Sequence, residues 1–396
     1  YFFLFFAIAA TFLASCSTDK FVPDGSYLLD KAELRSDAAD FTAPQLAQYV
    51  RQKENSRWFS FFKIPLGTYS LAGRDTTKWI NRTLQRIGEK PVYYDTLQAR
   101  LSCEDLRLAM NNMGYMNARV VFSTKVKGKK LKAIYTLVPG EPFMIDHFAY
   151  DIQDSVIADI LKPTLSQGIN TNRPHQFTVA ALDNERKRIT KILNDQGYYR
   201  FNKDYIYYTA DSIRGSRSVD VTLHLTKYRT TDTATPTLHP RYMIGSVNII
   251  PGDSTGLHLR RSIIADNTLI EPGKYFSATD LRTTYNNFAR LGAIRYTDIE
   301  FREMPQFDSI AIGKIFDYQP ASLRFLETNI KLSPTKPNTV AFQPEGTNTA
   351  GDLGAAAVLT YQNRNLFHGS ELFSIELRAA FEAIKGLEGY SNHNYE

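Results

Sequence analysis

The feature that most constrains the fold of this 396-residue sequence is a pattern that occurs three times. Each copy has an aromatic residue, two apolar residues, two variable positions and another apolar residue, at 27–32, 143–148 and 242–247. Internal repetition of this kind indicates one small structural unit used several times. A short apolar segment of this composition is typical of a β-strand, so each copy predicts the first strand of a unit.

A second repeated pattern predicts a long helix in each unit. An apolar residue precedes a serine or threonine, and leucine follows four positions later, with starts at Leu101-Ser102, Phe177-Thr178 and Phe276-Ser277. The hydroxyl can accept a hydrogen bond from a free amide at the helix start, and the flanking apolar residues can pack together. Gly114, Gly197 and Gly292 are the predicted helix ends, because glycine tolerates the left-handed conformation that closes a helix.

A β-hairpin is predicted after each of these helices. In the first copy Leu131, Ala133, Tyr135 and Leu137 stand at every second position, which is the period of a strand. Shorter first helices are expected near 42–52, 155–161 and 258–265. Each unit is therefore a strand, two helices and two strands, and the predicted fold class is α+β, with helices covering one face of a short sheet.

The first residues resemble a bacterial export signal. The run from Phe2 to Leu13 is apolar but too short to span a membrane as a helix. It ends in Leu13-Ala14-Ser15-Cys16, which resembles the lipobox of bacterial lipoproteins, where the cysteine is acylated and becomes the mature N-terminus. Cys16 is the expected lipid anchor, and the alternative is a buried core thiol. Cys103 is then the one cysteine left, so no intrachain disulfide is expected and Cys103 should be a packing residue.

The first unit is lengthened by an insertion at 55–95, which is rich in aromatic and basic residues. Ile80, Leu84 and Ile87 would share one face of a helix, with Trp79 and the three cations Lys78, Arg82 and Arg86 beside them. One interpretation is an interfacial helix on a membrane or a docking surface. The other is that the insertion packs on its own unit, which is the commoner arrangement because amphipathic helices usually face a protein core.

From residue 338 onward the sequence alternates in the manner of membrane β-strands. Four apolar residues would face lipid, namely Phe373, Ile375, Leu377 and Phe381. The residues between them, Ser374, Glu376, Arg378 and Glu382, would face a polar lumen. The segment Asn365-Leu366-Phe367-His368-Gly369 resembles the Asn-Leu-Phe-Gly turn near the start of BamA/TamA barrels, with His368 as an inserted residue.

With these motifs the chain resembles outer-membrane assembly proteins of the BamA/TamA superfamily, most of all the TamL-type lipoprotein with POTRA units and a surface-antigen β-barrel. The resemblance implies a signal peptide (1–16), a linker (17–24), three tandem POTRA-like β-α-α-β-β units (25–141 with the insertion 55–95, 142–240 and 241–334) and the first antiparallel strands of a transmembrane β-barrel (335–396). A few strands cannot close a barrel in lipid, so the barrel is expected to be truncated. Since no initiator Met precedes Tyr1, truncation is expected at the start as well.

The resemblance also implies a function in outer-membrane protein assembly and insertion, with the protein lipid-anchored in the outer membrane and its POTRA units in the periplasm. The implied partners are unfolded outer-membrane β-barrel proteins, outer-membrane lipid and a TamB-like inner-membrane tether. An exposed POTRA sheet edge can pair with an extended client strand through main-chain hydrogen bonds, although the sequence does not indicate which edge is free. The alternative is a dedicated exporter of the two-partner-secretion type.

No enzyme, cofactor or metal site is predicted. The sequence has no Gly-x-Ser-x-Gly nucleophile elbow, no His-Glu-x-x-His zinc motif and no phosphate-binding loop. Its seven histidines are dispersed, without the spacing of a metal site. The net charge of +6 comes from basic residues scattered among acids, which argues against a nucleic-acid partner.

Overall fold

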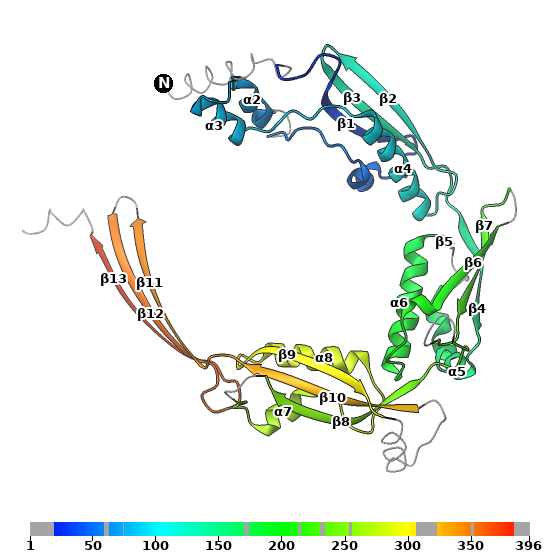
Figure 1. Ribbon diagram of the computed structural model, residues 1–396, viewed down its shortest axis with the longest axis vertical. Coiled ribbons are helices and arrows are strands. Elements are labelled where there is room, and N and C mark those ends of the chain that lie inside the picture. The colour runs from blue at the N-terminus through cyan, green and yellow to red at the C-terminus, as the bar shows by residue number, and fades with distance from the viewer. Residues whose placement is uncertain are drawn as a thin grey trace, which may run out of the picture. The chain divides into compact units, whose positions relative to one another are not determined.

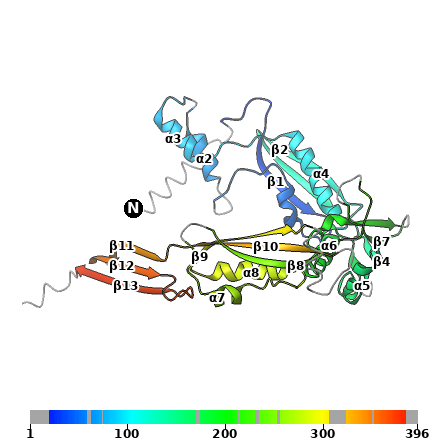
Figure 2. The ribbon, with the colours of Figure 1, turned by 60° about the horizontal axis from the view of Figure 1, so that its bottom comes forward.

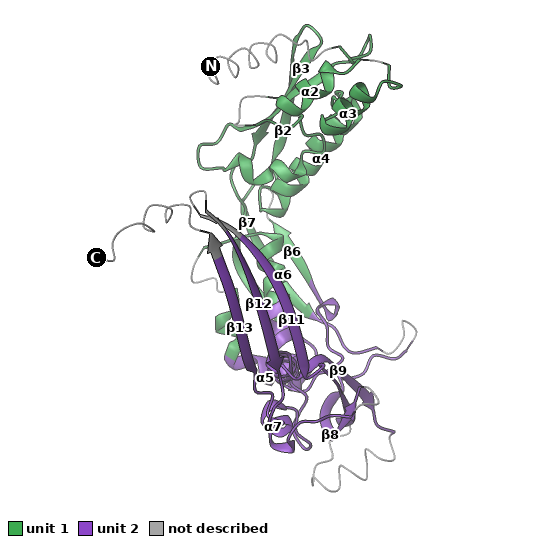
Figure 3. Ribbon diagram, turned by 90° about the vertical axis from the view of Figure 1, so that its left-hand side faces the viewer, with its two compact units in different colours: residues 1–151, 164–185, 208–224 green, residues 152–163, 186–207, 225–396 purple. Residues whose placement is uncertain are grey.

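The computed structural model describes residues 20–58, 63–73, 75–169, 174–212, 215–229, 234–252, 256–305, 323–349 and 352–383. The chain forms two compact units (Figure 3). One comprises residues 1–151, 164–185 and 208–224, and the other comprises 152–163, 186–207 and 225–396. None of the helices within the described ranges is both long and apolar enough to cross a membrane.

The first repeat is a three-stranded sheet with a long helix along it (Figure 1). Its elements are β1 (Leu28–Ser36), the 3₁₀ helix η1 (Ala43–Tyr49), α2 (Ile64–Leu71), α3 (Trp79–Ile87), α4 (Thr96–Asn112), β2 (Arg119–Lys127) and β3 (Lys130–Val138). The strand order is β1-β3-β2, with β1 parallel and β2 antiparallel to β3. Leu106 and Met110 of α4 share a buried core with Leu131 and Tyr135 of β3. Each such side chain stabilises the unit by about 1.5–3 kcal/mol on burial.

The second repeat has the same order of elements with a short additional strand. Its elements are β4 (Met144–Ile152), α5 (Ser155–Leu161), η2 (Lys162–Gln167), β5 (His175–Gln176), α6 (Val179–Asp195), η3 (Lys203–Tyr205), β6 (Ile206–Ser212) and β7 (Ser218–Leu225). The strand order is β5-β4-β7-β6. Ile145 of β4 and Val221 of β7 form a buried cluster against which Leu182 of α6 packs. The helix therefore covers one face of this sheet.

The third repeat returns to the topology of the first. Its elements are β8 (Arg241–Pro251), α7 (Arg261–Asn267), α8 (Ala278–Arg290), β9 (Ile294–Glu303) and β10 (Leu323–Pro334). The order is β8-β10-β9, with β8 parallel and β9 antiparallel to β10. Phe288 of α8 is fully buried in a core with Ile299, Leu326 and Ile330 of the sheet.

Three antiparallel strands follow, β11 (Asn338–Thr349), β12 (Asp352–Asn363) and β13 (Phe373–Ala383). They run side by side in the order β11-β12-β13 (Figure 2). The register places Phe342, Leu359 and Leu377 in one row across the sheet. Apolar residues of the three strands therefore share a face, as the alternation in the sequence predicts.

The prediction of an α+β fold with several β-α-α-β-β units is confirmed. The short first helices η1, α5 and α7 lie within a few residues of their expected positions. The ranges proposed for individual domains stay predictions, since the two compact units divide the second repeat between them.

Two of the three predicted helix starts are confirmed and one is wrong. The Thr178 hydroxyl accepts a hydrogen bond from the Ala181 amide (3.0 Å), and the Ser277 hydroxyl accepts one from the Asp280 amide (3.1 Å). In the first repeat α4 begins earlier, and Asp95 is its N-cap. Ser102 lies buried within α4, where its hydroxyl donates to the Gln98 carbonyl at 2.7 Å.

The predicted helix ends at Gly114 and Gly197 are confirmed by φ values of +91° and +99°. Gly292 has no such role, because α8 ends at Arg290 and is followed by Leu291 in an extended conformation. Cys103 is a half-buried free thiol packed against the first core, as expected. Burial raises the pKa of this thiol, and the neighbouring negative charge of Glu104 adds to the shift.

Candidate functional site

The predicted lipobox, residues 13–16, lies outside the described residues. The first described residues, Lys20 and Phe21, already belong to the folded part of the first repeat. The Lys20 ammonium donates to the Ala72 carbonyl at 2.9 Å, and the Phe21 ring meets Tyr69 edge-on at a centroid distance of 5.2 Å. Part of the range expected to be a linker is therefore packed against α2.

The predicted barrel turn residues lie together in the turn between β12 and β13. The Asn365 carboxamide organises this turn, since its oxygen accepts from the Ser370 amide (3.1 Å) and its nitrogen donates to the His258 carbonyl (2.5 Å). The His368 carbonyl accepts from the Arg260 amide at 2.9 Å. His258 and Arg260 come just before α7, so the turn is docked on the third repeat. Leu366 and Phe367 are 43% and 68% exposed beside it.

Glu371 closes the same turn from its far end. Its carboxylate accepts from the amides of Phe367 (3.2 Å) and Gly369 (3.0 Å) and pairs with Arg260 at 2.9 Å. Backbone hydrogen bonds and the charge of Arg260 hold the pKa of Glu371 below its ordinary value. A Cβ on Gly369 would overlap the Arg260 and Glu371 side chains. His368, the inserted residue, has a φ of +60°.

In every repeat the start of the outer edge of the first strand is occupied by the residues that precede the long helix, which is α4, α6 or α8. The Tyr94 amide donates to the Tyr27 carbonyl in the first repeat (2.8 Å), Phe177 to Phe143 in the second (2.9 Å) and Phe276 to Tyr242 in the third (3.0 Å). The acceptors are the three repeated aromatic residues of the sequence. We call these the sealed edges, because the backbone groups at the start of each first strand already have partners within the repeat.

The opposite end of each sheet is a strand with one neighbour, β2, β6 or β9. Among the described residues, no backbone hydrogen bond joins β2 to a segment other than β3. The other two edges are partly covered by side chains. Arg186 donates to the Ile206 carbonyl of β6 (2.5 Å), and the Ile299 amide of β9 donates to the Tyr285 hydroxyl (2.9 Å). We call these three strands the open edges, and β2 is the least covered.

The side chains of β2 divide between the core and solvent. Val120 and Phe122 pack against the first core, while Val121 and Val126 are 56% and 52% exposed. Exposed apolar side chains on a strand with an unpaired edge offer both main-chain and side-chain contacts to an added strand. The edge also carries Lys125, a residue type that limits uncontrolled pairing of edges.

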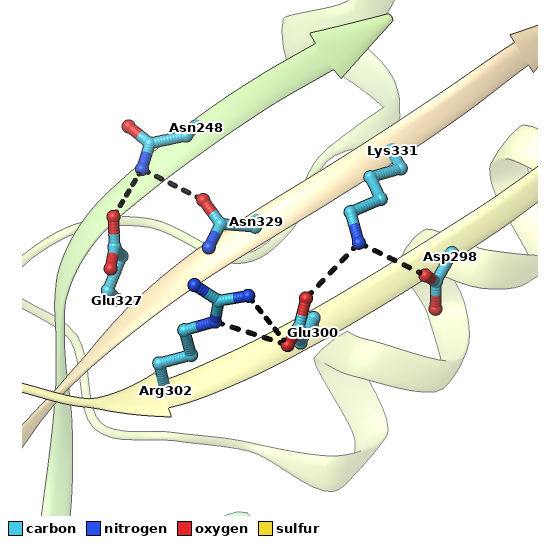
Figure 4. A network of polar contacts seen from close by, with 7 residues as sticks. All are labelled: Asn248, Asp298, Glu300, Arg302, Glu327, Asn329 and Lys331. Carbon is cyan, nitrogen blue, oxygen red and sulfur yellow. Dashed lines mark hydrogen bonds and ion pairs between the residues drawn. The ribbon is translucent and has the colours of Figure 1, made fainter. Parts of the chain in front are cut away.

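A polar network covers part of the third sheet (Figure 4). The Lys331 ammonium of β10 pairs with Glu300 at 3.2 Å and with Asp298 at 3.8 Å on β9. Asn248 of β8 donates to Asn329 of β10 at 3.0 Å. Hydrogen bonds from Lys331 and Arg302 lower the pKa of Glu300. These residues alternate along the strands with core residues such as Ile330, so they lie on the sheet face opposite the core.

The sheet β11-β12-β13 has one apolar and one polar face. Phe342, Leu377 and Phe381 are 67%, 63% and 73% exposed. On the other face Arg378 pairs with Glu345 at 3.0 Å. An exposed apolar sheet face backed by a polar one is the arrangement of strands between lipid and a polar lumen.

The described residues hold one group with metal-ligand chemistry, which sequence reasoning missed. Ligand atoms of Asp146, His147 and Asp220 lie within 4.8 Å of one another, and all three residues are exposed. Asp146 and His147 lie in β4 and Asp220 lies in β7, so the three residues are far apart in the sequence and meet only in the folded sheet. No short sequence motif therefore indicates the group. His239, by contrast, is a packing residue: it is 3% exposed, burial lowers its pKa, and Nε2 lies 2.8 Å from the Thr226 carbonyl.

No protein-family model and no curated protein matches the chain. Among solved structures it is similar to POTRA domains 3–5 of BamA from Haemophilus influenzae, with 12% identity, a TM-score of 0.39 and coverage of 78% of this chain and 99% of that one. It is also similar to BamA from Haemophilus ducreyi lacking POTRA domains 1–3, with 11% identity, a TM-score of 0.41 and coverage of 60% of this chain and 37% of that one. For CdiB from Acinetobacter baumannii the identity is 8% and the TM-score is 0.31, with coverage of 61% of this chain and 39% of that one.

All three are structural similarities at low sequence identity. The chain spans 37% of the second of these structures and 39% of the third.

Proposed function

We propose that this chain belongs to an outer-membrane protein assembly machine, in which the repeats bind unfolded β-barrel clients by strand addition and deliver them to the C-terminal strands. The observation that carries the proposal is the asymmetry of each repeat. One edge of every sheet is sealed at its start by the residues before the long helix, and the opposite end of the sheet is an open edge. A client strand can therefore add along the whole of β2, whereas the edge of each first strand is blocked at its start.

Strand addition at β2 gives binding that is tolerant of sequence and readily reversed. A nine-residue edge presents about nine backbone groups outward, each contributing about 1 kcal/mol when paired. Ordering nine client residues costs about 1–2 kcal/mol each. The ordering cost equals or exceeds the gain from main-chain hydrogen bonds, so contacts with Val121 and Val126 decide whether a segment stays bound. Weak binding of this kind suits a protein that passes clients on.

The C-terminal strands favour the same proposal. Their exposed apolar face and polar reverse are what the wall of a membrane β-barrel requires. The β12–β13 turn, held to the third repeat by Asn365 and Glu371, would fix the start of that barrel to the periplasmic repeats. With an acyl group on Cys16 the protein would be an outer-membrane lipoprotein of TamL type. A TamB-like tether is the proposed inner-membrane partner, and the proposed activity involves no enzymatic step or cofactor.

The edge can be tested with a photo-crosslinking residue at Val121 of the full chain and a peptide from an outer-membrane β-barrel strand. The matched control position is Leu108, which is 50% exposed on α4 of the same repeat. Crosslinking is expected at 121 and not at 108. N-methylation of every second client residue removes the N–H groups that face either β2 or solvent. Crosslinking should be abolished when the methylated set faces β2 and retained when it faces solvent. Scrambling the order of the client side chains should not abolish crosslinking. Equal loss with both sets, or equal labelling at both positions, would contradict strand addition.

Depletion of the full-length protein in its host separates assembly from export. A broad fall of β-barrel proteins in isolated outer membranes, with soluble periplasmic proteins unchanged, is expected. Loss of a single secreted partner with normal barrel levels would make the protein a dedicated exporter instead.

A further inference from the structure

The insertion of the first repeat carries an amphipathic helix, α3, whose apolar side is mostly exposed, with Leu84 of that side partly buried. α3 has no buried residue. Trp79, Ile80 and Ile87 are 69%, 52% and 68% exposed. The insertion packs on its own unit through α2, whose Leu66 is buried with Leu28 of β1, but the apolar side of α3 does not share in that packing. Large apolar side chains gathered on one surface usually mark an interaction site.

The polar side of α3 is what attaches it to the protein. The Asn81 carboxamide oxygen accepts from the Gly73 amide at 2.8 Å, and the Gln85 carboxamide donates to the Gly73 carbonyl at 3.3 Å. At the end of the helix, a Cβ on Gly88 would lie 2.5 Å from the backbone nitrogen of Tyr69 in α2. An ordinary surface helix turns its apolar side inward, and α3 does the reverse.

Three cations border the apolar side. At about 100° per residue, the three exposed apolar residues of α3 occupy an arc of about 100°, and Lys78, Arg82 and Arg86 occupy a neighbouring arc of about 80°. All three cations are exposed. Aromatic and aliphatic residues flanked by cations are the pattern of helices that lie in a membrane interface.

The N-terminal end of the described chain is fixed to the same insertion. Lys20 is hydrogen-bonded to Ala72 at the end of α2, and Phe21 packs against Tyr69 within α2. Cys16 precedes Lys20 by four residues, which reach about 14 Å at most when fully extended. An acyl group on Cys16 would therefore keep α2 and α3 beside the membrane that holds it.

We propose that α3 is a second membrane contact of this chain and lies in the headgroup region of an anionic phospholipid bilayer, with Trp79, Ile80 and Ile87 toward the acyl chains. Anionic headgroups would pair with the cations beside the apolar side, whereas an apolar protein groove would leave those cations without partners. The acyl group alone would leave the first repeat free to turn about its tether. The helix in the surface fixes one orientation. This contact is separate from client binding at the open edges and does not depend on it.

The chain's own tryptophans provide a local test. In the 396-residue chain with Cys16→Ser and Trp58→Phe, Trp79 is the sole tryptophan. We expect its emission to shift to the blue, and brominated lipid to quench it, on vesicles of phosphatidylethanolamine and phosphatidylglycerol. On phosphatidylcholine alone both effects should be much weaker. Because the signal is local to α3, binding of the C-terminal strands to the vesicles does not produce it.

Two variants in this background separate the contributions. Replacing Lys78, Arg82 and Arg86 with glutamine should weaken the lipid contact of Trp79 roughly a hundredfold, about fivefold for each cation near an anionic surface. Ile80→Ser with Ile87→Ser should reduce quenching on both kinds of vesicle. The matched control is Leu97→Ser with Leu108→Ser, which removes two exposed leucines from α4 and should change nothing.

Three results would overturn the proposal. One is Trp79 emission that stays unshifted and unquenched although the chain is bound to the vesicles. Another is quenching that survives the three glutamine substitutions. The third is a blue shift without vesicles that grows with protein concentration, which would make the apolar side of α3 an interface between copies of the chain.

Discussion

The carboxylate of Asp195 caps a helix in the next repeat, and removing it should loosen that helix locally. Asp195 is the last residue of α6. Its Oδ1 accepts from the Thr279 amide at 2.7 Å, and its Oδ2 accepts from the Thr279 hydroxyl at 2.8 Å. Ser277 is the N-cap of α8, so Thr279 stands in its first turn with an amide that has no partner within the helix.

The expected effect of Asp195→Ala follows from the two interactions that it removes. Loss of a side-chain cap costs about 1 kcal/mol, and loss of a negative charge at the positive end of a helix costs about 0.3–1 kcal/mol. A total of about 2 kcal/mol corresponds to roughly thirtyfold faster opening. Asp195→Asn keeps an acceptor and loses the charge, so it should speed opening only about threefold.

Hydrogen exchange of the Thr279 amide measures this opening without assuming that the whole chain unfolds in one step. Asp159→Ala is the control, since Asp159 is an exposed aspartate of α5. It should leave exchange at Thr279 unchanged. Exchange in Asp195→Ala that rises less than twofold at Thr279, or that rises equally in the cores of all repeats, would refute the capping role.

Three further predictions follow from single contacts. Lys132 and Arg35 lower the pKa of Glu33 from 4.5 to about 2. The stabilisation by this carboxylate is therefore present above pH 4.5 and is lost as the pH falls toward 2. Glu33→Gln should flatten that part of an acid denaturation curve. Gly114→Ala should cost about 1–2 kcal/mol from the left-handed backbone alone, and more because the new Cβ would lie 2.6 Å from the Phe177 carbonyl, which denaturant titration can measure. Asn365→Ala removes two hydrogen bonds worth about 1 kcal/mol each, and should speed exchange of the Ser370 amide at least tenfold.

The repeated architecture could be predicted because each element has a local signal. Hairpin alternation, the Thr178 and Ser277 caps and the two left-handed glycines all act within a few residues. The error at Ser102 has a physical cause. A serine after an apolar residue can occur inside a helix when its hydroxyl bonds to the carbonyl four residues earlier, as Ser102 does. The true start, Tyr94-Asp95, has the aromatic-then-cap order of the other two copies, and this signal was present in the sequence.

The open and sealed edges could not be predicted, because they depend on which backbone groups meet across long stretches of chain. Tyr94 pairs with Tyr27, and nothing in either segment specifies the other. The orientation of α3 was missed for a related reason. A helical pattern of apolar residues gives the existence of a face but not its direction, and here Asn81 and Gln85 turn that face outward. The same applies to the β12–β13 turn, whose dock on Arg260 joins residues more than a hundred positions apart.

The length of the β2 edge sets the size of what it can hold. Nine residues at about 3.3 Å each give an edge about 30 Å long. A strand that crosses the hydrocarbon core of a bilayer has about 9–11 residues. One open edge therefore matches one membrane strand and leaves the turns on either side of it free. A client held in this way would be bound one strand at a time, and each bound segment would have the length of one strand of its future barrel.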